Sequence, residues 1–196
     1  MTSLPNMTDE QLYRAYLKGD ERALRTLVER HGENLTLFLT GMVNDYGEAR
    51  NLMHESFAVA ATTTRLFLGH SSFKTWLFGI GRNLALQELR RAKKVYLTDF
   101  SEIEGSLPNR EPLPQAVLEK EERAQQLHDA LQRIPLDYRQ ALTLVYFQDM
   151  SYTEAGRVMG KSQKQVSNLV YRGKLKLRDI LEADLDAANG TKDNPA

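Results

Sequence analysis

The sequence predicts an all-α protein made of two small helical domains, and three observations lead to this fold class. Apolar residues recur every three to four positions along most of the 196 residues, as they do on one face of a helix. Ser, Thr and Asp residues that can cap helices precede several of these segments. No stretch alternates apolar and polar residues for long enough to predict a β-strand. The chain contains no cysteine, which excludes disulfide scaffolds and thiolate zinc sites.

The first predicted domain covers residues 1–95. It begins with the capping box Thr-Asp-Glu-Gln at residues 8–11, and the helix that follows is expected to end before Gly19. The next helices are expected at residues 23–28 with Asp20 as the cap, at 35–43, from Glu48 onward, and from Phe73 to Lys94.

The middle of the chain differs in composition from both ends. Residues 95–122 hold three of the six prolines and seven acids against two bases. Such a segment has little apolar surface to bury, so residues 96–119 are predicted to be a flexible acidic linker, with a short helix beginning near Gln115. The second domain is then expected at 120–185, and the polar residues 186–196 are expected to form a disordered tail.

Two closely spaced capping boxes predict a helix-turn-helix in the second domain. Residues 151–154, Ser-Tyr-Thr-Glu, begin a short helix that Gly160 can end, and residues 162–165, Ser-Gln-Lys-Gln, begin the next one. At 100° per residue, the second helix places its apolar residues on one side and its polar residues on the other. The polar side carries Lys164, Asn168, Tyr171 and Arg172, flanked by Gln165, Ser167 and Lys174.

Charge is neutral overall but separated along the chain. The sequence has 26 basic and 26 acidic residues, whereas residues 161–178 carry six bases and no acid and residues 82–94 carry five bases and one acid. A basic helix is often only a solvated surface. Because this one follows a double-capped turn, DNA binding is the favoured interpretation, with the bases placed to neutralise phosphates.

Aromatic and basic residues also alternate in the first domain, between residues 67 and 94. Cations that follow a nucleic-acid backbone and rings that accept unstacked bases suit single strands. The spacing of Phe73, Trp76, Leu77 and Ile80 is that of a core stripe, however, and burial is the favoured interpretation for Trp76.

Taken together, these segments resemble bacterial extracytoplasmic-function (ECF) sigma factors. Phe73-Lys74-Thr75-Trp76-Leu77 with Arg82-Asn83-Leu84-Ala85 is similar to the second region of that family, and Ser151-Tyr152-Thr153-Glu154-Ala155 with residues 162–178 is similar to the fourth. The resemblance covers residues 8–94 and 123–182. It implies a subunit that joins core RNA polymerase and recognises two promoter elements, minus ten with the first domain and minus thirty-five with the second.

The resemblance also implies roles for particular residues. The minus-ten element and a flipped base would be bound by Phe67, Gly69, His70, Ser71, Ser72, Lys74, Arg82, Asn83, Arg90 and Arg91. The minus-thirty-five duplex would be bound by Ser162, Lys164, Gln165, Ser167, Asn168, Tyr171, Arg172, Lys174 and Lys176. The polymerase clamp would be bound by Asp45, Glu48, Leu52, Glu55 and Phe57, with Arg50, Asn51 and His54 standing where family members usually carry more acids.

The expected partners are promoter DNA, the clamp and flap of core RNA polymerase, and an anti-sigma factor. The protein is expected to be monomeric when free and cytoplasmic, because Met1 to Glu10 lacks the features of a signal peptide and no stretch approaches the ~20 apolar residues of a membrane span. No catalytic residue, metal or cofactor is expected. The four histidines are scattered, and residues 79–84 lack the third glycine of a dinucleotide fingerprint. The alternative function is a helix-turn-helix regulator that does not engage polymerase.

Overall fold

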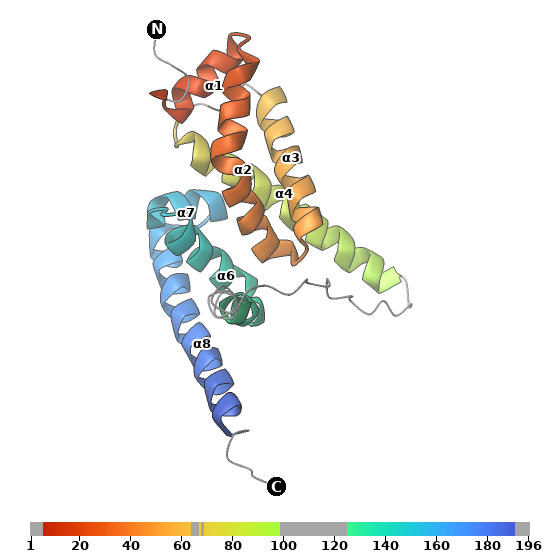
Figure 1. Ribbon diagram of the computed structural model, residues 1–196, viewed down its shortest axis with the longest axis vertical. Coiled ribbons are helices and arrows are strands. Elements are labelled where there is room, and N and C mark those ends of the chain that lie inside the picture. The colour runs from red at the N-terminus through yellow and green to blue at the C-terminus, as the bar shows by residue number, and fades with distance from the viewer. Residues whose placement is uncertain (1–5, 64–66, 68, 99–124, 191–196) are drawn as a thin grey trace, which may run out of the picture.

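The computed structural model describes residues 6–63, 67, 69–98 and 125–190, and these form helices joined by short turns, with no strand among them (Figure 1). The helices are α1 (Asp9–Leu17), α2 (Glu21–Val43), α3 (Tyr46–Thr62), α4 (Phe73–Thr98), α6 (Leu136–Leu142), the π-helix η3 (Thr143–Phe147), α7 (Tyr152–Met159) and α8 (Gln163–Gly190). Residues 125–133 are helical as well. The predicted all-α class is confirmed.

Helix α1 begins at the predicted capping box. The Thr8 hydroxyl accepts from the Gln11 backbone N–H, and the Gln11 side chain accepts from the Thr8 N–H at 2.9 Å. The buried Tyr13 then joins α1 to the end of α3, because its hydroxyl donates to the Ala60 carbonyl oxygen at 2.8 Å. A hydrogen bond between segments 47 residues apart in the chain sets where α3 ends relative to α1.

The sequence predicted two helices where the structure has one, and this prediction was wrong. Helix α2 runs through 23 residues, from the Asp20 cap to Asn44 in the left-handed conformation. No capping residue interrupts it, and its buried face continues without a break through Leu27, His31 and Leu35. Because that face meets α1, α3 and α4 along its length, one continuous helix buries more apolar surface than two short ones.

Helix α4 lies close against α2 and α3 at Gly81. A Cβ atom at this glycine would lie 3.0 Å from Leu35 Cδ1 and 3.1 Å from Ser56 Oγ, so a larger residue would require these side chains to shift. Phe73, Leu77 and Phe78 of α4 are fully buried in the resulting core. This packing determines which face of α4 is left for other contacts.

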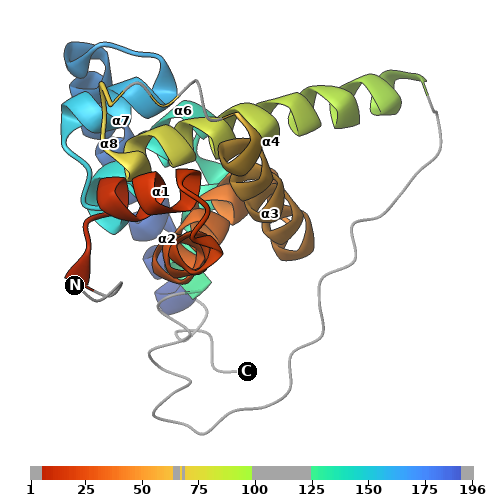
Figure 2. The same cartoon turned by 90° about the horizontal axis from the view of Figure 1, so that it is seen from above.

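The second domain packs directly on the first. Helix α7 lies against α4, and α6 lies against α2, as the two views in Figures 1 and 2 show. The Arg139 guanidinium donates to the Gly41 carbonyl oxygen at 2.9 Å, and the Gln148 amide donates to the Asn34 carbonyl oxygen at 3.4 Å. The sequence predicted two domains on a tether and did not anticipate this contact.

The predicted linker and tail lie mostly outside the described residues. The short helix expected near Gln115 falls in the undescribed segment 99–124, as do most residues of the proposed linker. Helix α8 continues to Gly190, so residues 186–190 of the predicted disordered tail are helical. Within the described part of the chain, no helix is both long and apolar enough to cross a membrane.

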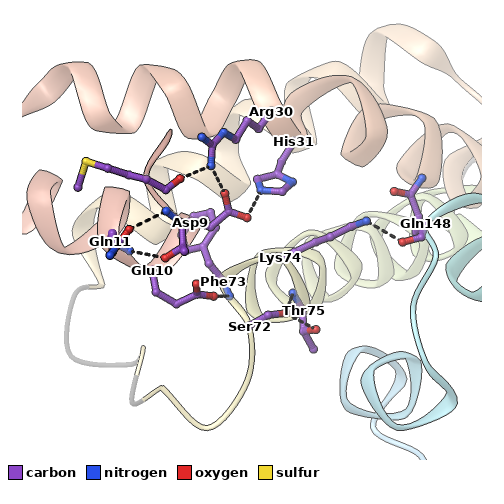
Figure 3. A network of polar contacts seen from close by, with 12 residues as sticks. Asp9, Glu10, Gln11, Arg30, His31, Ser72, Phe73, Lys74, Thr75 and Gln148 are labelled. Atoms are coloured by element: carbon purple, nitrogen blue, oxygen red, sulfur yellow. Dashed lines mark hydrogen bonds and ion pairs between the residues drawn. The ribbon is translucent and has the colours of Figure 1, made fainter. Parts of the chain in front are cut away.

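A charged network holds the start of α1 to α2 (Figure 3). The Asp9 carboxylate accepts from Arg30 Nη1 at 2.9 Å and lies 2.6 Å from His31 Nε2. The neighbouring Glu10 accepts from the backbone N–H of Phe73 at 3.1 Å, at the start of α4. The His31 hydrogen bond lowers the pKa of Asp9 more than any other contact, and Arg30 lowers it further against the opposing effect of burial.

We expect the Asp9 network to make folding sensitive to acid. A carboxyl whose pKa is lower in the folded state contributes stability above its ordinary pKa, and that stability is lost as the pH falls through the folded value. Asp9→Asn should therefore lower the free energy of unfolding at pH 7 by about 1–3 kcal/mol. It should also flatten the loss of stability between pH 5 and pH 3 in urea denaturation. Glu29→Gln, an exposed carboxyl on α2, is the matched control and should leave both unchanged.

Candidate DNA and polymerase interfaces

The helix-turn-helix is held by two capping boxes. The Ser151 side chain accepts from the Glu154 N–H at 3.2 Å, and the Glu154 carboxylate accepts from the Ser151 N–H at 2.9 Å. The Ser151 hydroxyl, 2.7 Å from the Glu154 carboxylate, lowers the pKa of Glu154 most, and the Ser151 N–H lowers it further. Gly160 ends α7 with φ +65°, a left-handed conformation that glycine adopts without strain. The second box follows at Ser162, so both predicted boxes are confirmed.

The turn between α7 and α8 passes unusually close to Gly156. A Cβ atom there would lie 2.5 Å from the Lys161 carbonyl oxygen, a distance that real Cβ atoms do not tolerate. The Lys161 N–H also donates to the Gly156 carbonyl oxygen at 2.8 Å. The glycine, which is unfavourable inside a helix, is therefore explained by the approach of the turn.

The nine predicted minus-thirty-five residues lie on the solvent-exposed surface of α8. Val166, Val170 and Gly173 on the opposite side of the helix are buried against α6 and α7. The exposed set is Ser162, Lys164, Gln165, Ser167, Asn168, Tyr171, Arg172, Lys174 and Lys176. We call this set the basic face of α8. It presents donors, one large aromatic ring (Tyr171, 66% exposed) and four cations to solvent.

Gln165 also caps the start of α8. Its side-chain oxygen accepts from the Ser162 backbone N–H at 2.8 Å, while the Ser162 hydroxyl accepts from the Gln165 N–H at 3.2 Å. The amide oxygen of Gln165 is thus committed to the cap. Only its NH2 group remains to contact a ligand, which makes Gln165 a hydrogen-bond donor at this surface.

The predicted minus-ten loop is only partly exposed. Gly69 and His70 are exposed, and Ser71 is half-buried. The Ser72 hydroxyl accepts from the Thr75 N–H at 3.2 Å and so caps α4. Residue 68 of this loop lies outside the described structure, as do the preceding residues 64–66.

Phe67 does not stand free as a stacking ring. It packs at the edge of an aromatic cluster, with its ring centroid 5.4 Å from that of Tyr13, 6.2 Å from that of Phe73 and 5.1 Å from that of Trp76. Phe67 is half-buried, and its contact with DNA stays a prediction. The clustering also places the half-buried Trp76 against core residues, as its spacing predicted.

The predicted minus-ten residues of α4 fall into two groups. Asn83, Arg90 and Arg91 are exposed, as a DNA-binding role requires. Lys74 and Arg82 are half-buried beneath the second domain, and burial lowers the pKa of Arg82 from its ordinary value. The sequence indicated that these five residues are hard to absorb into a core, and it had no means to show that another domain covers two of them.

The predicted clamp-binding residues divide in a similar way. Asp45 is exposed and caps α3 by accepting from the Glu48 N–H at 2.7 Å, and Glu55 is exposed. Leu52 and Phe57 are 4% and 5% exposed and belong to the core, so their predicted direct contact with polymerase is corrected. Both residues instead hold the exposed face of α3 in place.

Sequence reasoning missed one prominent residue on this surface. Tyr46, in the first turn of α3, is 62% exposed and borders an open cavity that Arg50 and Thr36 also line. Its position directly after the Asp45 cap, where the apolar stripe of α3 has not yet begun, was the available indication. No group of three potential metal ligands occurs among the described residues.

Family models match both halves of the chain. The family model for sigma-70 region 2 matches residues 27–95, and that for sigma-70 region 4 matches residues 124–177. The RNA polymerase sigma-H factor of Pseudomonas aeruginosa is 31% identical over 174 residues, which cover 85% of this chain and 90% of that protein. The ECF RNA polymerase sigma factor SigM of Bacillus subtilis is 27% identical, over 89% of this chain and 95% of its own.

Solved structures show the same fold. CnrH, a sigma factor of Cupriavidus metallidurans whose structure was solved in complex with the cytosolic domain of CnrY, matches with a TM-score of 0.65 at 26% identity, covering 90% of this chain and 98% of that one. RpoE of Bartonella quintana, in complex with the anti-sigma factor NepR, matches with a TM-score of 0.66 at 23% identity, covering 82% of this chain and 97% of that one.

We expect Gly156→Ala to destabilise the helix-turn-helix. The added methyl group would meet the Lys161 carbonyl oxygen, so the turn must move, at a cost of about 1–3 kcal/mol in unfolding free energy. Gly79→Ala is the matched control, because it is also within a helix but has no atom within 4 Å of the added carbon. That variant should gain up to about 1 kcal/mol from helix propensity. Equal effects of the two substitutions in thermal unfolding would contradict the explanation of Gly156.

Proposed function

Because the chain belongs to the ECF branch of the sigma-70 family, we propose that its two helical domains divide the recognition of one promoter between them. The protein is a sigma factor, a subunit that brings core RNA polymerase to promoters and supports strand opening. The observation that carries this conclusion is that a family model matches each of the two domains, in the order that the family requires. A regulator that never engages polymerase is not favoured, since it would leave the match at residues 27–95 without a function.

The second domain is proposed to hold the minus-thirty-five element as duplex DNA. In a helix-turn-helix, the second helix enters the major groove with its N-terminal residues against base edges. Lys164, Ser167 and Asn168 of α8 occupy those positions and are exposed. Arg172, Lys174 and Lys176 follow along the same helix, where they can neutralise phosphates.

The first domain is proposed to bind the minus-ten element during opening. The exposed Gly69 and His70 lie in the loop that precedes α4, and Asn83 and Arg90 lie further along the helix. Extruding a base costs a few kcal/mol of stacking, which contacts from such a loop can offset. Lys74 and Arg82 can join this interface only when the second domain moves off them.

The exposed side of α3 is proposed to bind the polymerase clamp. Asp45, Glu48 and Glu55 give it an acidic character, which disfavours DNA and suits a basic protein surface. The exposed Tyr46 adds a large ring of the kind that protein interfaces favour. The second domain would contact the flap.

The remaining expectations follow from this assignment. An anti-sigma factor is proposed as a further partner, as RpoE has in NepR. The proposed site of action is the cytoplasm, where polymerase and promoters are found. The proposal gives the protein no catalytic step of its own and requires no metal or cofactor.

Transcription with purified components tests the function. Core polymerase plus the full-length protein should start transcripts at defined positions on a genomic promoter library, and core polymerase alone should not. Substituting Glu55 by Lys, which reverses one exposed charge on the proposed clamp face, should reduce these transcripts several-fold while leaving DNA binding by the free protein unchanged. The absence of any specific start site would exclude the sigma function.

We expect two substitutions of Gln165 to separate its capping role from its DNA contact. Gln165→Glu keeps an acceptor for the Ser162 N–H and removes the NH2 donors, so the melting temperature should be unchanged and minus-thirty-five affinity should fall at least tenfold. Gln165→Ala removes both, and should also cost about 1 kcal/mol of stability. Full affinity of the Glu variant would show that Gln165 only caps the helix.

A further inference from the structure

Helix α1 holds the start of α4 through the side chain of Glu10. Figure 3 shows Glu10 reaching from α1 to Phe73, the first residue of α4, whose backbone N–H donates to the Glu10 carboxylate at 3.1 Å. The N–H groups in the first turn of a helix have no acceptor within that helix, so each needs a partner from outside. A residue 63 positions earlier in the chain therefore caps the helix that carries the proposed minus-ten contacts.

The first turn of α1, from which Glu10 extends, is itself fixed in place. The capping box at residues 8–11 sets its backbone conformation. The neighbouring Asp9 then ties the turn to α2, because its carboxylate accepts from Arg30 and contacts His31. Since these contacts hold the turn on α2, the Glu10 carboxylate reaches α4 from a backbone with a defined position.

Tyr13 of α1 meets the same part of the chain. It follows Glu10 by three residues, and residues three apart lie on the same face of a helix. The ring centroid of Tyr13 lies 5.2 Å from that of Phe73 and 5.4 Å from that of Phe67, and both Tyr13 and Phe73 are fully buried. The loop before α4 is thus held against α1 at both ends, by Tyr13 at Phe67 and by Glu10 and Tyr13 at Phe73.

The residues between these two ends include the exposed part of the loop. Gly69 and His70 are exposed, and Gly69 has φ +73°. Because glycine changes its backbone conformation at little cost, this part of the loop takes its shape from the positions of its ends. At the second end, Ser72 caps α4 locally through the Thr75 N–H, and Glu10 adds the cap from another helix.

A carboxylate next to a surface proposed to bind DNA can act in two opposite ways. By its charge alone, the half-buried Glu10 repels phosphates, so removing it would favour DNA binding. As the acceptor that fixes the loop, it has the opposite effect. Without it the loop must be ordered when the base binds, and that ordering reduces the free energy left for binding. The direction of the change on removing Glu10 therefore separates the two roles.

We propose that Glu10 is a positioning residue of the minus-ten site, whose hydrogen bond to Phe73 holds Gly69 to Ser72 in the conformation that receives an extruded base. This inference rests on the proposed function of the loop. Glu10 acts through the Phe73 N–H and does not itself contact DNA. Helix α1, which contains none of the predicted DNA-binding or clamp-binding residues, thereby contributes to strand opening.

Two substitutions of Glu10 separate its hydrogen bond from its charge. Glu10→Gln keeps a side-chain oxygen that can accept from the Phe73 N–H and removes the negative charge, whereas Glu10→Ala removes both. Glu29→Gln and Glu29→Ala, at an exposed position of α2, make the same changes away from α4 and are the matched controls.

Amide hydrogen exchange on the full-length free protein reports the hydrogen bond directly. In NMR measurements, the Phe73 amide should exchange about tenfold faster in Glu10→Ala than in the unchanged chain, and within about twofold of the unchanged rate in Glu10→Gln. The amides of Val166 and Val170 in α8 should exchange alike in every variant, which separates local loss of the cap from unfolding. An unchanged Phe73 rate in Glu10→Ala would overturn the proposal.

Strand opening by the holoenzyme is the second readout, on promoters whose start sites transcription with purified components defines. Permanganate, which oxidises unpaired thymines, should show opening about three- to tenfold slower with Glu10→Ala, and no slower with Glu10→Gln than with the unchanged chain. Binding to closed duplex should be alike in all variants. Equal or faster opening with Glu10→Ala would overturn the proposal. Absence of any start site with the unchanged chain would exclude the sigma function and the role of Glu10 in opening, while the Phe73 exchange rate would still report the hydrogen bond.

Discussion

The close packing of α4 against α2 and α3 at Gly81 is the constraint on which the rest of the structure depends. Because a methyl group added at Gly81 would lie only 3.0 Å from Leu35 Cδ1, α4 can approach α2 this closely only with a glycine at that position or with a shift of the neighbouring side chains. Its apolar side is therefore committed to the core, where Phe73 and Leu77 are buried. Lys74 and Arg82 lie outside this core and meet the second domain, and the proposed DNA contacts of α4 follow from that orientation.

In both domains, burial of the apolar side of a helix leaves its basic side on the surface. In α8, burial of Val166, Val170 and Gly173 turns the basic face toward solvent, as burial of one side of α4 does for its cations. The two surfaces differ in accessibility. The basic face of α8 is open, whereas part of the α4 surface is occupied by Gln140 and Gln148. A chain with zero net charge can thus present two cationic surfaces, one of them open and the other partly covered by its own second domain.

Much of the candidate site could be predicted because its residues repeat with helical spacing. The basic face of α8 was predicted residue by residue, and all nine members are exposed. The errors concern residues whose type suits either a core or an interface. Leu52 and Phe57 were assigned to the clamp surface, yet both are buried in the core. Apolar residues at one spacing look alike in sequence, and only the neighbouring helices decide which of them remain accessible.

The sequence by itself determined the local structure of this protein: the helical class, the capping boxes at Thr8, Ser151 and Ser162, and the division of α8 into apolar and basic sides. These features depend on residues within one or two helical turns of each other, so a single sequence contains them. Only the tertiary structure decided that α2 is continuous, that Gly156 makes room for the Lys161 carbonyl, and that the second domain covers Lys74 and Arg82. Each of these depends on atoms brought together by packing, often from segments more than 50 residues apart, and spacing along the chain carries no record of such contacts.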